Sequence, residues 1–324
     1  MAEIITHPDG ELHLTDIADG FRLVTVKPVD ASQFIAVHSC ETSYPTDLIE
    51  KILAVKGIAW VCDEINRDVD PNYVSKYLLN DLAAYFASSD IAGRRVLDFG
   101  CGSGASTAIL AREYPDALFT GVELRADLLE IAKARADHYG LSNCSFIVSP
   151  DGSSLPQHLG EFDIVIMSAV VEHLLPDERP VILPLLWNQV KSRGYLFLDQ
   201  TPYRYFPIEL HTTMLPFINY LPDSLAFAYA KRCSNRIDEG ETWESLLRQG
   251  IRGATEKEIG SLLTNSEMLG CLGDVNDRID LWLKNTNPNK MAAAKHLTKG
   301  VLKLLYKTTG ICMVPDLALA YRKG

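Results

Sequence analysis

The sequence predicts an α/β protein with a mostly parallel, doubly wound sheet, because strand-like and helical segments alternate between residues 94 and 200. The clearest strand, Val96–Phe99, is apolar apart from Asp98 and runs into a glycine-rich turn that opens a helix. The turn carries glycines at alternate positions, namely Gly100, Gly102 and Gly104. Bare backbone of this kind lets a ligand approach closely. We therefore expect a binding site at the carboxyl ends of the strands.

The residues around this turn favour a nucleoside ligand without phosphates. A phosphate-binding loop would end in Gly-Lys-Ser or Gly-Lys-Thr, whereas Gly104 is followed by alanine and serine. Asp98 would repel a pyrophosphate and attract a cationic group. The next predicted strand, 117–122, leads into Glu123, an acid placed to accept hydrogen bonds from ribose hydroxyls. Alternatively, each acid simply caps the helix that follows it.

Further segments continue the alternation at the expected intervals, namely 149–156, 161–168, 171–174 and 194–199. Together with the glycine turn and Glu123, they resemble the class I S-adenosylmethionine-dependent methyltransferases, in the type-11, ubiquinone-biosynthesis-like branch. The resemblance covers residues 94–202. It implies a Rossmann-like sheet of seven strands whose last strand, 317–321, is antiparallel.

The resemblance also implies the cofactor, S-adenosyl-L-methionine, with S-adenosyl-L-homocysteine as the product. Asp151, in the loop after the third strand, matches the acid that receives the adenine amino group, although a Pro-Asp-Gly sequence is also typical of a turn. The residues expected to bind the cofactor are Asp98, Gly100, Gly102, Gly104, Glu123, Leu124, Asp151, Gly152 and Ser168.

Length and composition fit an enzyme larger than the minimal fold. The chain has 324 residues, of which 47% are hydrophobic, and a formal net charge of −11, which disfavours a nucleic-acid surface. Seven cysteines without a C-x-x-C pair predict neither a disulfide framework nor a zinc site, and so favour the reducing cytoplasm. We expect no membrane span, because no apolar run approaches the roughly 18 residues required.

We expect four parts along the chain. They are an N-terminal extension with a small β element and lid helices (1–93), an S-adenosylmethionine-binding core (94–200), a substrate-cap insertion (201–286), and a C-terminal helix with the final strand (287–324). Within the extension, alternating residues predict strands at 11–15 and 21–26, and helical spacing predicts helices at 47–55 and 72–86.

The cap begins with the segment 201–222, which combines a histidine and a glutamate with aromatic residues and prolines. Part of it resembles a Pro-x-Glu-x-His-Thr-Thr segment of bacterial type-11 methyltransferases. A hydroxyl acceptor needs a general base, and histidine suits neutral pH. We expect His211 to be this base, with Glu209 as its orienter or as an alternative base. His173, which follows the fourth strand, is the second candidate, and packing near the cofactor is its alternative role.

The side chains that bind the methyl acceptor are expected to come from the lid helix and the cap. Tyr73, Tyr203, Tyr205 and Thr212 are candidates to bind the substrate, although packing explains such aromatic residues equally well. We expect metal-independent O-methylation of a hydroxyl on a sugar, a glycosylated or lipid-linked intermediate, or a secondary metabolite. N- or C-methylation and a catalytically inactive cofactor-binding scaffold are the alternatives. No metal is expected, because only Glu172 and Asp199 are evident as acids near strands four and five.

A lysine stripe is the remaining feature that bears on partners. Lys295, Lys299, Lys303 and Lys307 recur every fourth residue in a predicted helix, 289–307. Apolar residues at Leu297, Val301, Leu304 and Leu305 predict that the lysines face outward. The stripe is either an ordinary solvated face or a contact with an anionic lipid surface or phosphate-bearing carrier. No heptad pattern predicts an oligomeric state.

Overall fold

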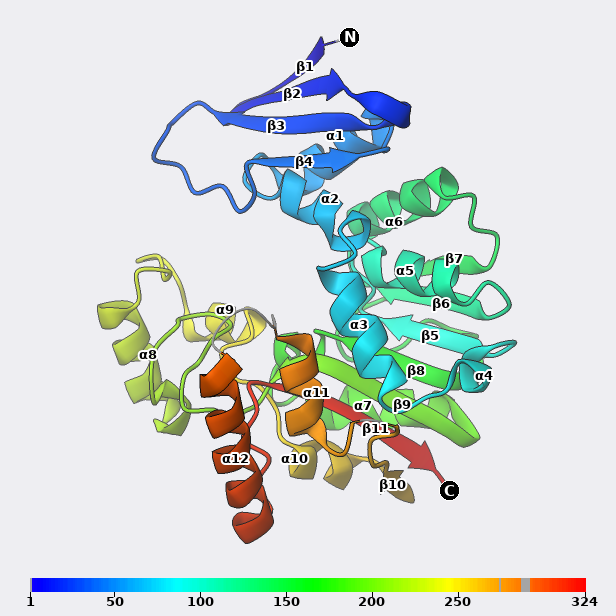
Figure 1. The fold of residues 1–324 in the computed structure, drawn as a ribbon, viewed down its shortest axis with the longest axis vertical. Helices are drawn as coiled ribbons and strands as arrows, with labels where there is room; N and C mark the ends of the chain where they lie inside the picture. Colours follow the sequence, from blue (N-terminus) through cyan, green and yellow to red (C-terminus); the bar gives the residue numbers. More distant parts are fainter. Residues whose placement is uncertain (1, 274, 287–291) are drawn as a thin grey trace. The chain divides into compact units, whose positions relative to one another are not determined.

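The computed structural model describes residues 2–273, 275–286 and 292–324 (Figure 1). The chain forms two compact units. The first contains residues 1–77 and 101–148, and the second contains residues 78–100 and 149–324. The chain therefore passes from one unit to the other inside the glycine-rich turn, between Gly100 and Cys101. The predicted four-part division of the chain stays a prediction.

The described strands include a seven-stranded sheet of the order β10-β11-β9-β8-β5-β6-β7. Its strands are β5 (Arg95–Phe99), β6 (Leu118–Glu123), β7 (Cys144–Val148), β8 (Phe162–Ser168), β9 (Val190–Pro202), β10 (Ser266–Met268) and β11 (Asp316–Lys323). β8 is parallel to β5 and β9, β6 is parallel to β7, and β11 is antiparallel to β9 and β10. The Rossmann-like sheet with an antiparallel final strand is thus confirmed. β10 lies within the range expected to form the cap, and it joins the sheet by pairing with the end of β11.

The central strands are apolar because both of their faces are covered. Ile164 to Met167 of β8 and Leu196 to Leu198 of β9 are almost fully buried. α7 (Arg179–Gln189) packs against β9. The rings of Tyr85 and Phe86 lie 6.1 and 6.0 Å from the ring of Phe197. This packing fixes the strand ends that carry polar side chains.

The first unit combines the N-terminal extension with helices that follow the glycine turn. Its antiparallel sheet runs in the order β1 (Ala2–His7), β2 (Gly10–Asp16), β3 (Arg22–Pro28) and β4 (Ser39–Thr42). Its helices are α1 (Thr46–Lys56), α2 (Val61–Val69), α5 (Ala105–Glu113) and α6 (Ala126–His138). Leu12, Ile52, Ile65 and Ile131 share one buried core. The extension therefore packs against α6 instead of forming a free lid.

The other helices are α3 (Val74–Ala83), α4 (Ser88–Ile91), α8 (Asp223–Cys233), α9 (Trp243–Arg248), α10 (Glu256–Leu262), α11 (Arg278–Asn285) and α12 (Ala292–Thr309), with short 3-10 turns at Ala18–Gly20, Val171–His173 and Ile218–Tyr220. In the second unit, α8 and α9 enclose a small core of their own with the loop that follows β9. Leu215, Ile218, Ala226, Leu246 and Ile251 form it. This core holds the segment 201–222 in place.

The predicted outward-facing lysine stripe is wrong for Lys299 and Lys303, which pair with α11, whereas Lys307 is exposed as predicted. Lys299 Nζ lies 2.7 Å from Asp280 Oδ1 of α11, and Lys303 Nζ lies 2.7 Å from Asp280 Oδ2. Val301 and Leu304 are instead 58% and 63% exposed. The helix is turned this way because the α11 carboxylate attracts the ammonium groups. The side chain of Lys295 and residues 289–291 lie outside the described part. Among described residues, no helix combines the length and apolarity that a membrane crossing requires.

Candidate active site

In the first unit, the glycine turn is shaped by a close approach to α6. Gly104 has φ +79° and is the N-cap of α5, and a Cβ there would lie 2.5 Å from Ala132 Cβ. Only glycine fits such a position. Gly102 N–H donates to Glu123 Oε2 at 3.1 Å, while Glu123 Oε1 accepts from the amides of Leu124 and Arg125 at 2.8 and 3.1 Å. Glu123 therefore ties the turn to the two residues that precede α6.

A buried charge network that we did not predict holds the same turn. Arg135 of α6 is fully buried, and its Nη1 donates to Ser103 O at 2.5 Å. Its guanidinium pairs with Glu64 at 3.1 Å and with Asp68 at 3.0 Å. Ser103 Oγ also donates to Glu64 Oε1. Burial raises the pKa of Glu64, but the cations, led by Arg135, outweigh it and bring the pKa down to about 2. The charges on α2 and α6 thus fix the backbone of the turn.

In the second unit, buried carboxylates lie on β5 and β9, the two strands that flank β8, and on α3. Asp98 at the end of β5 is 1% exposed, and Asp199 of β9 is fully buried with no partner for Oδ1. Burial, with a further contribution from Asp98, raises the pKa of Asp199 to about 7. Burial and the charge of Asp199 raise the pKa of Asp81 to about 8. Such a cluster favours a cationic ligand, because a positive charge would stabilise the ionised acids.

The backbone is strained where these strands end. Ala169 after β8 and Gln200 near the end of β9 have φ of +53° and +55°, which non-glycine residues rarely adopt. Gly100 has φ +75°, and a Cβ there would lie 2.6 Å from Val170 Cγ2. Strain at several neighbouring strand ends is typical of a functional site.

The remaining predicted cofactor residues occupy more exposed positions. Asp151 is exposed, and its Oδ1 accepts from Ser153 N at 2.8 Å and from Ser153 Oγ at 3.0 Å, as in a local turn. Hydrogen bonds from Ser153 lower its pKa. A Cβ on Gly152 would approach Glu178 Oε1 at 3.2 Å. Ser168 lies opposite Asp199 in the register of β8 and β9, and Leu124 is 49% exposed.

The two predicted catalytic histidines lie close together in the second unit. The ring centroids of His173 and His211 are 5.5 Å apart. Glu172 Oε1, fully buried and without a hydrogen-bond partner, is 3.8 Å from His173 Nε2. Glu172 Oε2 accepts from Thr201 Oγ1 at 3.1 Å. Donor atoms of the three residues lie within 4.8 Å of one another, so this cluster can hold a metal ion or move a proton.

The contacts of this cluster define its charge state. His173 Nδ1 lies 2.7 Å from the carbonyl oxygen of Arg248, and because a carbonyl only accepts, Nδ1 carries the hydrogen. The lone pair on Nε2 therefore faces Glu172. Burial lowers the pKa of His173 and His211 and raises the pKa of Glu172 to about 8. Neutral imidazoles are thus favoured, which is the form that accepts a proton.

Gly250 makes room for this arrangement, and the sequence contained no signal for it. Its φ is +91°, and a Cβ there would lie 2.7 Å from His211 Cδ2, 3.0 Å from His211 Nε2 and 3.1 Å from Glu172 Cγ. The His211 ring consequently packs over bare backbone at the end of α9. Any larger residue would displace it.

The side chains of Glu209 and Thr212 both form hydrogen bonds to the backbone in and around this segment. Glu209 Oε1 accepts from the amides of His211 and Thr212 at 2.7 and 2.8 Å, and Oε2 accepts from Thr213 N and Oγ1 at 2.5 and 2.6 Å. These bonds hold the backbone that carries His211. The hydroxyl of Thr212 donates to the Gln249 carbonyl at 3.0 Å.

The predicted substrate tyrosines are divided between the two units. Tyr73 belongs to the first unit, where its hydroxyl donates to Asp63 Oδ1 at 3.1 Å. Tyr203 and Tyr205 belong to the second. Tyr203 is 6% exposed, whereas Tyr205 is 47% exposed and stacks on Tyr220 at 6.4 Å.

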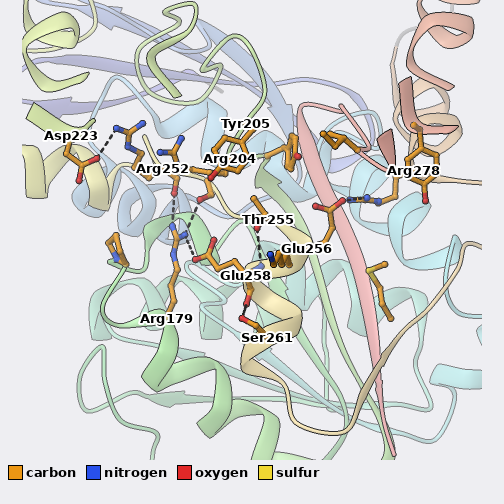
Figure 2. Close-up of a pocket in the computed structure, with 18 residues that line it drawn as sticks. Arg179, Arg204, Tyr205, Asp223, Arg252, Thr255, Glu256, Glu258, Ser261 and Arg278 are labelled. Atoms are coloured by element: carbon orange, nitrogen blue, oxygen red, sulfur yellow. Dashed lines mark hydrogen bonds and ion pairs between the residues drawn. The ribbon is translucent and has the colours of Figure 1, made fainter. Parts of the chain in front are cut away.

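Two cavities of the second unit share the lining residues Tyr203 and Gly253. The smaller, of about 170 Å³, is lined by His211 and Glu209 among others. The larger, of about 1010 Å³, is shown in Figure 2 and is here called the arginine pocket. Its basic lining residues are Arg179, Arg204, Arg252, Lys257 and Arg278. The sequence did not predict this pocket, because these residues lie far apart along the chain.

Comparison with known families supports the class that the sheet and the glycine turn indicate. Residues 96–194 match a family described as "Methyltransferase domain". The matched segment begins in β5 and ends within β9, and so includes the turn and Glu123. The chain thus contains a class I S-adenosylmethionine-dependent methyltransferase domain, and S-adenosylmethionine is the cofactor of this class.

Curated relatives carry the same chemistry in their names. The chain is 30% identical to a fatty-acid O-methyltransferase of Mycolicibacterium smegmatis over 43% of this chain and 46% of the relative. It is 34% identical to a ubiquinone biosynthesis O-methyltransferase of Methylococcus capsulatus over 36% and 48%, respectively. A trans-aconitate 2-methyltransferase of Yersinia pestis is 25% identical over 58% of each chain. The chain therefore spans about half the length of these relatives.

Solved structures resemble the chain at low sequence identity. A structure from Galdieria sulphuraria that is named as a "putative sarcosine dimethylglycine methyltransferase" aligns with a TM-score of 0.46 and 12% identity, over 78% of this chain and 85% of that one. A structure named StiE O-MT aligns with a TM-score of 0.42 and 17% identity, over 76% of this chain and 74% of that one. Scores this low add nothing to the fold assignment, which follows from the strand order itself.

Proposed function

We propose that the protein transfers a methyl group from S-adenosylmethionine to a hydroxyl of a small molecule. The observation that carries this proposal is the neutral cluster of Glu172, His173 and His211, because a hydroxyl acceptor must lose a proton during the transfer. Acceptors of the proposed kind are a sugar, a glycosylated or lipid-linked intermediate, or a secondary metabolite. The seven free thiols support a reducing, cytoplasmic setting.

The cofactor is proposed to contact the glycine turn and the strand-end acids. In this proposal, Asp98 binds the cationic amino-acid part, and Glu123 accepts hydrogen bonds from the ribose hydroxyls. Asp151 receives the adenine amino group. The remaining contacts come from Gly100, Gly102, Gly104, Leu124, Gly152 and Ser168. The buried carboxylates around Asp199 support binding of a cation.

The proposed reaction is an in-line displacement at the methyl carbon. The acceptor oxygen forms the new bond to carbon while the carbon–sulfur bond breaks and its electron pair stays on sulfur. His211 takes the hydroxyl proton, and Glu209 holds the backbone that carries His211. Burial and the neighbouring His173 ring keep the pKa of His211 low, so that its imidazole stays neutral before it takes the proton. Alignment of the reactants supplies most of the rate, and no metal takes part in these steps.

A test separates this reaction from its alternatives. His211→Ala should lower turnover on the true acceptor by about 10²- to 10⁴-fold, while calorimetry shows unchanged affinity for S-adenosylmethionine. The exposed His38→Ala variant is the matched control and should retain both. Normal turnover in His211→Ala would refute the base and favour N- or C-methylation. Cofactor binding without methylation of any component of a candidate extract would indicate a scaffold.

A further inference from the structure

We propose that the arginine pocket binds a phosphate ester or diphosphate carried by the methyl acceptor. This inference rests on the proposed function, and it specifies the acceptor class. Figure 2 shows Arg179, Arg204 and Arg252 at one end of the pocket and Arg278 at the other. The pocket shares the lining residues Tyr203 and Gly253 with the smaller cavity, which His211 lines. An acceptor seated in both would place an anionic group among the arginines and a hydroxyl beside the histidine.

Three of the pocket's arginines are already neutralised by single carboxylates. Arg179 Nη1 lies 3.0 Å from Glu258 Oε1, and Arg252 Nη2 lies 2.9 Å from Asp223 Oδ1. Arg278 pairs with Glu256. Arg179 and Arg252 also donate to backbone carbonyls, among them those of residues 218, 221, 252 and 253. These arginines build the wall of the pocket.

Arg204 and Lys257 are the two cations of the pocket that form no ion pair among the described residues. Neither forms an ion pair within 4.0 Å in the part of the chain that the structure describes. Arg204 donates to the carbonyl of Asn219 and lies over the ring of Tyr205, with 5.3 Å between the guanidinium carbon and the ring centroid. Burial and the charge of Arg252 lower its pKa. An anion bound in the pocket would stabilise the charged guanidinium of Arg204, and so oppose both the burial and the repulsion from Arg252.

The wall also contains buried donors without acceptors. Arg252 Nε and Arg278 Nη1 have no hydrogen-bond partner among the described residues, although the Arg252 side chain is only 5% exposed. An unsatisfied donor on a charged group is costly to bury. The local excess of positive charge is notable because the whole chain carries a net charge of −11. A pocket built in this way attracts an anion against the field of the rest of the protein.

Phosphate fits these observations better than a carboxylate does. Two uncompensated cations match the double charge of a phosphate monoester or diphosphate, and arginine forks favour phosphate oxygens. A volume of about 1010 Å³ also accommodates more than the anionic group itself. Tyr205, Tyr306 and Ile311 line the same cavity and offer apolar and aromatic surface to the organic part of such an ester.

The test measures binding of inorganic pyrophosphate and of tricarballylate to the full chain by calorimetry. We expect pyrophosphate to bind at least tenfold more tightly than tricarballylate. Arg204→Met and Lys257→Met should each weaken pyrophosphate binding at least tenfold. Arg232→Met, which removes an exposed arginine from α8, is the control and should leave it unchanged. Thermal unfolding checks that each variant is folded, and because Lys257 is exposed its substitution leaves the core intact.

A second comparison distinguishes a soluble from a lipid-linked source of the ester. Glucose 1-phosphate and vesicles that contain a prenyl diphosphate are compared as ligands. If one of them binds more tightly than the other, and Lys257→Met abolishes that binding, the inference is supported and the source is identified. Absence of pyrophosphate binding, equal binding by all variants, or tighter binding of tricarballylate would overturn it. S-adenosylmethionine is titrated in parallel. Failure of that titration alone would refute the proposed function and leave the pocket's anion specificity standing.

Discussion

Gly250 offers the sharpest test of the base, because an added methyl group would push His211 away from its position. In Gly250→Ala the new Cβ would lie 2.7 Å from His211 Cδ2, whereas ordinary contact begins at 3.4 Å, so the ring must move by about 0.7 Å. A displacement on the order of 1 Å at a reacting group costs about 10²-fold in rate. We therefore expect kcat to fall about ten- to hundredfold, with cofactor affinity unchanged.

The substitution also costs stability, and a matched variant separates the two effects. Alanine at φ +91° is strained by about 1–3 kcal/mol. Gly57→Ala places alanine at φ +72° with nothing within 4 Å, and so carries backbone strain without a clash. Steady-state kinetics and urea unfolding of both variants are the assays. If Gly250→Ala unfolded as readily as Gly57→Ala yet kept kcat within twofold of wild type, the placement of His211 would not matter for catalysis.

Three other outcomes are expected. Affinity for S-adenosylmethionine, measured by calorimetry between pH 6 and 8, should increase with pH. The reason is that the pKa of Asp199 is about 7, and its ionised carboxylate attracts the cation. Constant affinity over this range would exclude a role for Asp199 in cofactor binding. Zn²⁺ should inhibit turnover by occupying the lone pair of His211, and a chelator alone should leave turnover unchanged, whereas loss of turnover on chelation would show that the reaction uses the metal. Arg135→Met should destabilise the protein to urea by about 3–5 kcal/mol by leaving Glu64 and Asp68 unpaired; a loss below 1 kcal/mol would contradict the network.

The sheet and the glycine turn could be predicted because their signals are local. The apolar run of β5 and the turn after it lie within eleven consecutive residues, and the strand acids follow at regular intervals. β10 escaped prediction because three residues at the edge of a sheet carry no periodic signal. α2 was missed although Val61, Ile65 and Val69 recur every fourth residue, which is the spacing of a helix face.

The site was only partly predictable, because its geometry depends on residues distant in sequence. His173 and His211 were both named, but their proximity depends on the loop that contains Gly250. Arg135 could have been found, since it continues the buried face formed by Leu128 and Ile131 at helical spacing. A charged residue at such a position indicates a buried partner.

The Arg135 network has a consequence for how this protein can be divided. The acids that neutralise the guanidinium come from α2, while the backbone it steadies belongs to the turn some forty residues later. A fragment starting at residue 94 would keep the cation and lose both counter-charges, together with the apolar cover over Ile131. Residues 1–93 are therefore part of the scaffold of the glycine turn. A fusion protein that contained only the segment from residue 94 onward would be unstable.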